Sequence, residues 1–108
     1  MKTIDSALGA LADPTRRAII EQLLDGSEHR VSDIVEFHSM SFAGVSKHVR
    51  VLESAGLVGR RKSGRTHFLH YRPEGLQDAT DWIDQTKALW NRRLGKLESL
   101  LESDESKK

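Results

Sequence analysis

Apolar residues recur every three or four positions through five stretches of this chain, the spacing that predicts amphipathic helices. The fourth stretch, for example, places Val45, Val49 and Leu52 on one side of a helix. The last stretch is the longest and carries apolar or small residues from Leu76 to Leu101. The pattern therefore predicts five helices, over residues 4–12, 14–25, 33–37, 42–54 and 75–102.

Capping residues indicate where these helices begin. Asp13 is an N-cap acceptor, and Pro14 after it suits the first helical position. Ser32 and Ser41 are placed to cap the third and fourth helices, and Gly56 is placed to end the fourth. Because a turn of only a few residues joins the third helix to the fourth, the pair is typical of a helix-turn-helix.

The hydrophobic pattern changes after Gly56. Residues 57–62 and 66–71 are short runs rich in Val, Thr, Phe, Leu and Tyr, and Ser63-Gly64 between them can form a tight turn. This predicts a β-hairpin with five basic residues in or beside it, which are Arg60, Arg61, Lys62, Arg65 and Arg72. A basic hairpin directly after a helix-turn-helix is a wing. The predicted fold is mainly α with an α+β wing, a winged helix-turn-helix of five helices and a two-stranded hairpin.

The last predicted helix is longer than a small winged domain can cover, at about 42 Å for 28 residues. Its overhang carries apolar side chains that need a partner surface, and the first helix has the same need on a smaller scale. We therefore expect a homodimer that forms through the N- and C-terminal helices. The predicted interface residues are Ile4, Leu8, Leu11, Ile83, Trp90, Leu94, Leu97 and Leu101.

Length and composition limit the remaining possibilities. The 108 residues suffice for one domain, predicted over 1–102, and residues 103–108 lack periodicity and are predicted to be a disordered tail. No apolar run is long enough for a membrane span, and the N-terminus shows no signal peptide, so we expect a cytoplasmic protein. Cysteine is absent, which excludes disulfides, zinc fingers, iron–sulfur clusters and thiol chemistry.

The net charge of +1 conceals a strong segregation along the chain. Residues 37–73 contain seven Lys and Arg against one acid, Glu53, a net charge of +6, whereas the remaining residues carry 10 basic and 15 acidic side chains. Such a segment favours a polyanionic partner over a merely solvated surface. Together with the helix-turn-helix and the basic wing, it predicts binding to double-stranded DNA.

The helical wheel of residues 42–54 separates candidate DNA contacts from the core. Its outward side and first turn should enter the major groove with Ala43, Gly44, Ser46, Lys47 and Arg50. Ser41 at the helix start suits a phosphate, as do the wing residues Arg60, Arg61, Lys62 and Arg65. His48 lies at the boundary, where internal packing and a phosphate contact are equally open. Phe42 could touch a thymine methyl or pack within the protein.

Catalysis finds no support in the sequence. Asp78, Asp81 and Asp84 follow one another at a spacing of three residues. Acids near the start of a helix are favoured by the helix dipole, so we interpret these three as a solvent-exposed stripe. There is no nucleophile elbow, glycine-rich phosphate loop or metal motif. We expect no enzyme activity and no cofactor. The competing hypothesis is a winged-helix module that binds another protein instead of DNA.

The order of these elements resembles the ArsR/SmtB family of bacterial repressors. The resemblance covers roughly residues 4 to 101 and is carried by Asp13-Pro14-Thr15-Arg16-Arg17 and by the stretch from Val45 to Val58, Val-Ser-Lys-His-Val-Arg-Val-Leu-Glu-Ser-Ala-Gly-Leu-Val. The family pattern reads Val-Ser-x-His-Leu and then Leu-x-x-Ala-Gly-Leu-Val. The resemblance implies a homodimeric winged-helix repressor that binds an operator and leaves it on a signal.

The family's common metal sites are missing from this sequence. Where members carry Cys-Val-Cys-Asp-Leu, this chain has Arg30-Val31-Ser32-Asp33-Ile34, so both thiolates are absent. At the last-helix site only Asp78 matches, because the other ligand positions fall on Thr80, Asn91 and Leu94. One carboxylate without imidazole cannot make a tetrahedral zinc site. We expect no metal, and a releasing signal of another kind that the sequence does not identify.

Overall fold

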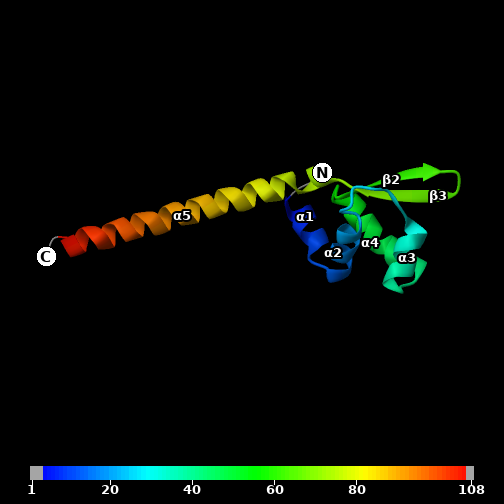
Figure 1. Cartoon of the computed structure of the whole chain (residues 1–108), viewed down its shortest axis with the longest axis horizontal. Coiled ribbons are helices and arrows are strands. Elements are labelled where there is room, and N and C mark those ends of the chain that lie inside the picture. The colour runs from blue at the N-terminus through cyan, green and yellow to red at the C-terminus, as the bar shows by residue number, and fades with distance from the viewer. Residues whose placement is uncertain (1–3, 107–108) are drawn as a thin grey trace.

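The computed structural model describes the backbone of residues 4–106 and the side chains of residues 4–102. Over this range the chain forms five α-helices, one short 3₁₀ helix and three strands. Their bounds are α1 Ile4–Leu11, α2 Pro14–Gln22, β1 His29–Arg30, α3 Val31–His38, α4 Phe42–Ser54, β2 Val58–Ser63, β3 Thr66–Tyr71, η1 Pro73–Leu76 and α5 Gln77–Ser106. All elements except α5 gather at one end, so the molecule measures 77 × 26 × 22 Å (Figure 1).

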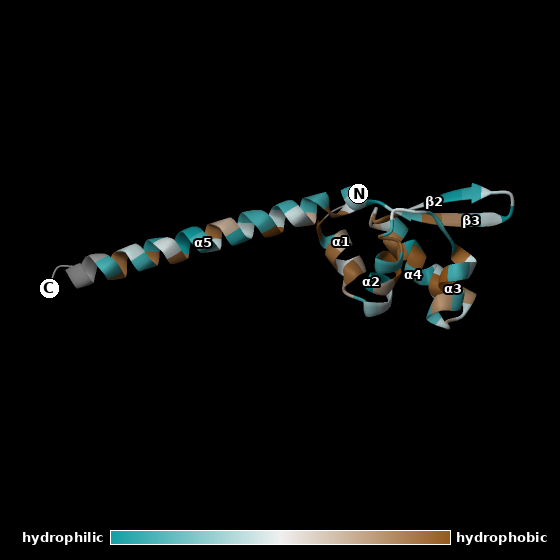
Figure 2. Cartoon of the chain, in the orientation of Figure 1, coloured by the Kyte–Doolittle hydropathy of each residue, from teal (hydrophilic) through white to brown (hydrophobic). Residues whose placement is uncertain are grey.

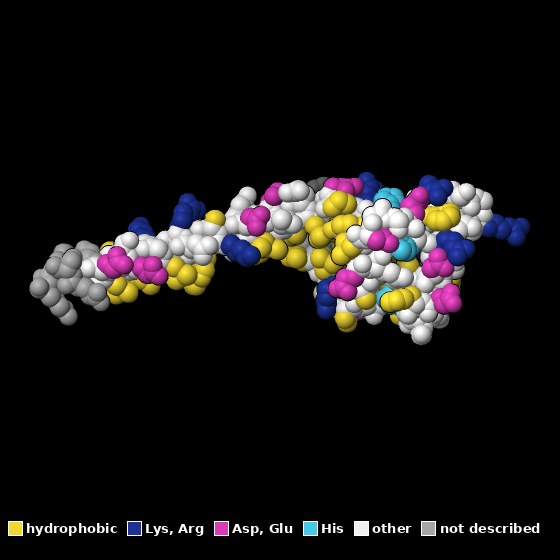
Figure 3. Space-filling view, in the orientation of Figure 1, with side chains coloured by type: hydrophobic (Ala, Val, Ile, Leu, Met, Phe, Trp, Pro, Cys, Tyr) yellow, Lys and Arg dark blue, Asp and Glu magenta, His cyan; other side chains and the backbone are white. Residues whose placement is uncertain are grey.

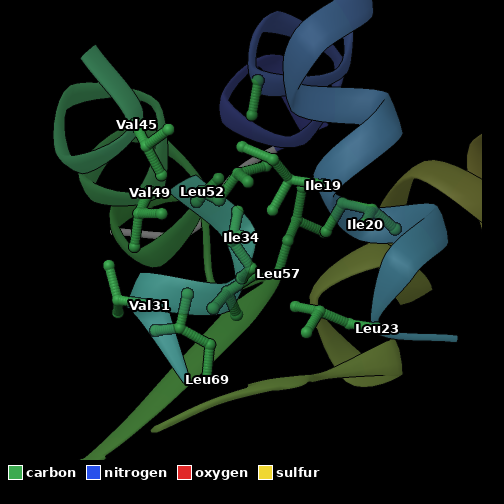
Figure 4. Close-up of a cluster of buried hydrophobic side chains, with 13 residues drawn as sticks. Ile19, Ile20, Leu23, Val31, Ile34, Val45, Val49, Leu52, Leu57 and Leu69 are labelled. Carbon is green, nitrogen blue, oxygen red and sulfur yellow. The ribbon is translucent and has the colours of Figure 1, made fainter. Parts of the chain in front are cut away.

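The hydrophobic core lies between α2, α3, α4 and the sheet. Val45, Val49 and Leu52, the predicted inward stripe of α4, are completely buried. Their side chains point toward Ile34 of α3, among further apolar residues of α2 and the strands (Figure 4). Burial of these aliphatic side chains is the main force that holds the helix-turn-helix against the sheet. The core therefore sets how α4 and the hairpin are oriented relative to each other.

Two predicted N-caps are confirmed. The Asp13 carboxylate accepts a hydrogen bond from the Arg16 backbone N–H at 3.0 Å, and Pro14 follows at the first helical position of α2. The Ser41 hydroxyl accepts from the Gly44 N–H, also at 3.0 Å, and so caps α4. Both acceptors satisfy backbone N–H groups that have no partner within the helix.

The end of α4 is also as predicted. Gly56 adopts φ +76°, and the N–H of Leu57 donates to the Leu52 carbonyl at 3.0 Å. This 6→1 bond and the left-handed glycine form a Schellman motif, which closes the helix and turns the chain into β2.

The boundaries of α2 and α3 differ from the prediction. Helix α2 ends at Gln22 rather than near residue 25, and Leu23 after it is completely buried. Helix α3 begins at Val31, with Arg30 as the N-cap and no side-chain cap bond, so Ser32 is not its cap. The reason is tertiary, because β1 ends at Arg30 and Val31 is already buried in the core.

The predicted two-stranded hairpin is part of a three-stranded antiparallel sheet, in the order β1-β3-β2. In β1, His29 pairs with Leu69 and Arg30 with Phe68 of β3. A strand of two residues is too short to show alternation, so the prediction missed it. Between β2 and β3 the turn residues are Gly64 and Arg65, and Gly64 adopts φ +61°. Glycine at the first position of a two-residue hairpin turn fits the backbone twist of the strands.

Helix α5 is longer than predicted and projects away from the rest of the molecule (Figures 1 and 2). Its backbone continues to Ser106, so residues 103–106 of the predicted disordered tail are helical, and residues 107–108 lie outside the described range. Extending an existing helix adds one hydrogen bond per residue without a new nucleation cost, which explains the extra turn. No helix within residues 4–106 has the length and apolarity that crossing a membrane requires.

Candidate nucleic-acid interface

Helix α4 presents one buried and one exposed side. Ala43, Lys47 and Arg50 are exposed on the side opposite the core, as the sequence predicts. Neither Lys47 nor Arg50 makes a hydrogen bond or an ion pair with any other described side chain. Ser46 is half-buried on the flank of the helix. The two cations are therefore free to contact an external anion.

The first turn of α4 is tightly built around its cap. A methyl group at Gly44 would lie 3.2 Å from the Ser41 hydroxyl and 3.3 Å from the Met40 side chain. Contacts this short are tighter than ordinary van der Waals packing. Glycine at this position therefore leaves room for the capping hydroxyl of Ser41. The space that the Ser41 cap needs is thus a reason for glycine at position 44. The cost of glycine to helix stability is small in the first turn.

Phe42 does not pack into the core. Its side chain is 62% exposed and borders a cleft of about 200 Å³ between the start of α4, the start of α3 and the wing. The cleft is lined by Arg30, Val31, Ser32, Phe42, Arg60, Arg65, Thr66 and His67. An aromatic ring beside guanidinium groups offers both apolar contact and positive charge. No sequence pattern predicts this grouping, because the four segments meet only in the fold.

The wing cations fall into two groups. Arg60 binds Glu53 at 2.7 Å, and Arg61 binds Glu28 at 2.9 Å while its guanidinium lies 4.6 Å from the centre of the Phe68 ring. Lys62 and Arg65 are exposed and make no such contact within the described residues. Of the four predicted wing contacts, two thus carry a neutralising partner and two are free.

His48 joins α4 to the start of α2. Its Nδ1 atom lies 3.8 Å from the Asp13 carboxylate and 3.5 Å from Nη1 of Arg16, and the side chain is mostly buried. The backbone N–H of Arg16 holds the pKa of the Asp13 carboxyl below its usual range, and the nearby His48 and Arg16 side chains act in the same direction. Of the two interpretations left open for His48, the structure therefore provides the internal contact.

Arg16 and Arg17 have a role that the sequence analysis did not assign. Arg16 donates to the carbonyls of Ala10 at 2.6 Å and Gly9 at 3.1 Å, and Arg17 donates to the Leu11 carbonyl at 2.6 Å. Together they satisfy carbonyls at the C-terminus of α1, where positive charge is favoured. The sequence signal for this role was the position of the two arginines, directly after a short helix and the proline that ends it.

The histidines and acids do not assemble into a metal site. Within the described residues, no three His, Asp or Glu side chains converge as metal ligands would. His29 instead contacts Asp25 at 2.9 Å, and His38 contacts the Gln22 amide oxygen at 3.0 Å. The Ser27 backbone N–H, with the Ser27 hydroxyl and His29, lowers the pKa of Asp25 to about 2.

The predicted dimerisation residues divide by exposure. Leu11 packs against the core of its own chain, and Ile4 is half-buried. The other six are large exposed hydrophobic residues, which are Leu8, Ile83, Trp90, Leu94, Leu97 and Leu101. In Figure 3 hydrophobic side chains follow one side of α5 along its length. This leaves an apolar surface that the chain does not cover itself.

Comparison with known proteins places these features in context. Residues 13–59, which contain α2 through the start of β2, match the model of the bacterial regulatory protein family arsR. The chain is 35% identical over 100 residues to the HTH-type transcriptional regulator Rv2034 of Mycobacterium tuberculosis, covering 93% of this chain and 90% of that protein.

A second relative and a solved structure agree with this match. The chain is 29% identical over 80 residues to the transcriptional repressor SdpR of Bacillus subtilis, covering 74% of this chain and 88% of the relative. An ArsR-like transcriptional regulator from Rhodococcus sp. RHA1 has a similar fold, with a TM-score of 0.77 and 26% identity over 90% of this chain and 91% of that one. The fold is therefore that of a winged-helix regulator.

Proposed function

Because the chain belongs to the ArsR family of bacterial regulatory proteins, we propose that it is a transcriptional repressor that binds an inverted-repeat operator as a homodimer. Its family and relatives are transcriptional regulators that bind DNA, not enzymes, which agrees with the lack of catalytic motifs. The relative named as a repressor, SdpR, supports the negative sense of the regulation.

One observation supports direct DNA binding above all others. Lys47 and Arg50 on α4 and Lys62 and Arg65 on the wing are exposed and unpaired among the described side chains. On this proposal α4 enters the major groove, where Lys47 and Arg50 reach base edges, while the wing cations bind phosphates. A two-fold dimer would place its recognition helices in successive major grooves, about 34 Å apart.

The releasing signal is proposed to be neither a metal nor a thiol reaction. The chain has no cysteine, and the last-helix metal positions hold Thr80, Asn91 and Leu94 beside Asp78. Zinc, cadmium, arsenite and peroxide should therefore leave the affinity for the operator unchanged. Release of the operator at stoichiometric zinc would contradict this and would direct attention to the histidines.

The experiment that tests the function selects bound genomic fragments with the purified protein and sequences them. An inverted repeat should emerge, and the affinity for that site should fall steeply as salt rises, because bound phosphates release counterions. Enrichment of no sequence, together with no salt-dependent shift on DNA from its own promoter, would reject DNA binding. The protein-interaction hypothesis would then be favoured.

A further inference from the structure

The cleft beside Phe42 combines positive charge with apolar surface in one small space. We call it the wing cleft, because it lies between the hairpin and the starts of α3 and α4, the two helices drawn below the hairpin in Figure 1. It holds about 200 Å³ and is lined by Arg30, Val31, Ser32, Phe42, Arg60, Arg65, Thr66 and His67. Three of these residues are arginines and none is an acid, so the wing cleft favours an anion.

The strand register explains how the wing contributes to the wing cleft. Leu69 of β3 is completely buried, and side chains two residues apart on a strand point to the same face. His67 therefore faces the side on which α3 and α4 lie. Arg60 of β2 is the direct partner of Leu69 in the sheet and points to this face as well. The sheet thus directs an imidazole and a guanidinium toward the two helices.

Several polar groups of the wing cleft have no partner among the described residues. The Nδ1 atom of His67 is buried and makes no hydrogen bond there. The Arg65 guanidinium and the hydroxyls of Ser32 and Thr66 likewise make none to any residue in the described range. Buried polar atoms in folded proteins are nearly always hydrogen-bonded. This set of unpaired groups therefore favours a ligand that accepts hydrogen bonds.

The other two arginines of the wing cleft indicate which anionic group suits it. Arg30 donates from Nε and Nη2 to the two carboxylate oxygens of Asp33, both at 3.2 Å. Arg60 donates in the same way to Glu53, at 3.3 and 2.7 Å. Both are bidentate pairs, the geometry in which a guanidinium matches a planar carboxylate. Arg65 is free to form the same kind of pair with a carboxylate from outside the chain.

The apolar members of the wing cleft define the rest of the ligand. Phe42 is 62% exposed at the start of α4, and the buried Val31 lies on the same cleft. An exposed aromatic ring gains from stacking against a second ring. A cavity of about 150 Å³ accommodates a benzene molecule, so the wing cleft has room for one six-membered ring and a carboxylate.

We propose that the wing cleft binds a small aromatic carboxylate and that this ligand releases the operator. The carboxylate pairs with Arg65 and accepts hydrogen bonds from Ser32 and Thr66, while the ring packs against Phe42. Arg65 is one of the cations proposed to bind DNA phosphates, so a bound ligand withdraws it from the DNA. The release step rests on the proposed function, whereas binding of the ligand to the free protein does not.

Titration of the full-length protein with benzoate, followed by calorimetry and by amide NMR shifts, tests the binding step. Benzoate should bind to a single site per chain, and acetate, benzyl alcohol and inorganic phosphate should each bind at least about tenfold more weakly, because each lacks the ring or the carboxylate. No binding of benzoate would overturn the proposal. Acetate or phosphate that binds as tightly as benzoate would also overturn it, because the wing cleft would then take any anion.

Substitutions place the site within the chain. Arg65→Gln should weaken benzoate binding by about tenfold and Phe42→Ala by about threefold to tenfold. Both side chains are exposed, so neither change removes core packing. Arg92→Gln removes the same charge from α5, and Phe37→Ala removes another exposed phenylalanine; both controls should stay within about twofold of the wild type. Equal losses in the controls would show that benzoate binds elsewhere and would overturn the proposal.

Operator affinity, measured with benzoate and with acetate at the same concentration, tests the release step. Benzoate should weaken operator binding at least about fivefold more than acetate does, and this difference should disappear in Phe42→Ala but persist in Phe37→Ala. Operator binding without any benzoate binding would overturn this proposal and leave the proposed function in place. Benzoate binding that depends on Arg65 and Phe42, in a protein that binds no DNA, would support the site and reject the function. Benzoate bound at the site with no effect on operator affinity would overturn the release step.

Discussion

At the scale of single residues, internal partners separate the surface cations by availability. Arg16 and Arg17 donate hydrogen bonds to backbone carbonyls of α1. Arg60 and Arg61 form ion pairs with glutamate carboxylates. Within residues 41–72, the cations left without such contacts are Lys47, Arg50, Lys62 and Arg65. A charge that is already paired gains less from a phosphate, because the existing ion pair must first be broken. Sequence position alone could not make this distinction.

Replacing Lys47 or Arg50 with Ala should weaken operator binding by about 1–3 kcal/mol, with a smaller loss on random DNA. The reason is that both side chains project from the exposed side of α4 and contact base edges on the proposed model. Titration of labelled operator and scrambled DNA gives both affinities. Arg92→Ala removes the same charge from α5 and should change neither affinity. Equal losses on operator and random DNA would mean that these residues bind only phosphates.

Asp25 should make folding stability depend on acid pH. Its pKa lies at about 2, below the ordinary value of 3.8 for an aspartate, because its carboxylate accepts hydrogen bonds from Ser27 and His29. As the pH falls from about 4 to 2, the unfolded chain takes up the proton first, so the stabilisation present above pH 4 is lost. The Asp25→Asn variant should therefore lose less stability than the wild type over this range.

Thermal unfolding at several pH values measures how much stability the wild type and Asp25→Asn each lose as the pH falls. Ser27→Ala removes one donor and should shift the pH dependence in the same direction but by less. Parallel pH curves for the wild type and Asp25→Asn would show that the contact is absent in solution.

At the scale of elements, short segments are joined by close backbone contacts. The clearest case is η1, which leads the chain from the wing into α5. A methyl group at Gly75 would overlap the Gly56 carbonyl oxygen, just after the end of α4. The direction in which α5 leaves the domain is therefore set by backbone packing against the Schellman motif at the end of α4.

Gly75→Ala should destabilise the protein by about 1–3 kcal/mol, because the Gly56 backbone cannot move aside without breaking the end of α4. Gly95→Ala is the matched control. Nothing lies within 4 Å of a methyl group there, and alanine in a helix interior should stabilise by up to about 1 kcal/mol. Chemical denaturation of both variants measures the two effects, and a neutral Gly75→Ala would show that the contact is looser than described.

The wing should contribute salt-dependent affinity mainly through its unpaired cations. Removing Lys62 and Arg65 deletes four charges per dimer, and the slope of log K against log salt should become shallower by about 3–4 if all four bind phosphate. The paired variant Arg60→Ala with Arg61→Ala should change the slope less, because Glu53 and Glu28 already neutralise these residues. Wild-type affinity and slope in the Lys62 and Arg65 variant would mean that the wing does not touch DNA.

At the scale of the whole molecule, the long α5 is the dominant feature. Its 30 residues extend about 45 Å, far beyond the core formed by the other elements. Large apolar side chains along this projection are exposed in the single chain, and a second chain that covers them would gain the hydrophobic free energy of their burial. The proposed dimer and the length of α5 are thus linked by the same physical requirement.

Sedimentation should give a mass of about 24 kDa at micromolar concentration, twice the 12.2 kDa of the chain. Replacing Trp90 and Leu94 with Glu should shift the protein to a monomer, because unpaired charges would be buried in the interface. Asp81→Lys, on the far side of α5, should remain a dimer. A monomeric wild type with a fully helical α5 would remove the basis for a two-fold complex with DNA.

Much of the architecture follows from neighbouring residues. The spacing of Val45, Val49 and Leu52, the caps Asp13 and Ser41, and the stop at Gly56 act within one or two turns, so the sequence alone determined the helix-turn-helix and its buried side. The hairpin strands followed for the same reason. Residues 30–34 and 80–94 also showed, without any coordinates, that the family's common metal ligands are replaced there.

Only the tertiary structure decided features whose partners lie far apart in the chain. Strand β1 exists because His29 and Arg30 pair with β3, and Arg61 is neutralised by Glu28, 33 residues away. His48 reaches Arg16 across 32 residues. No local spacing records such contacts, because they depend on how the core brings distant segments together. The sequence therefore determined which side of α4 faces outward, and the fold decided which cations remain free there and on the wing.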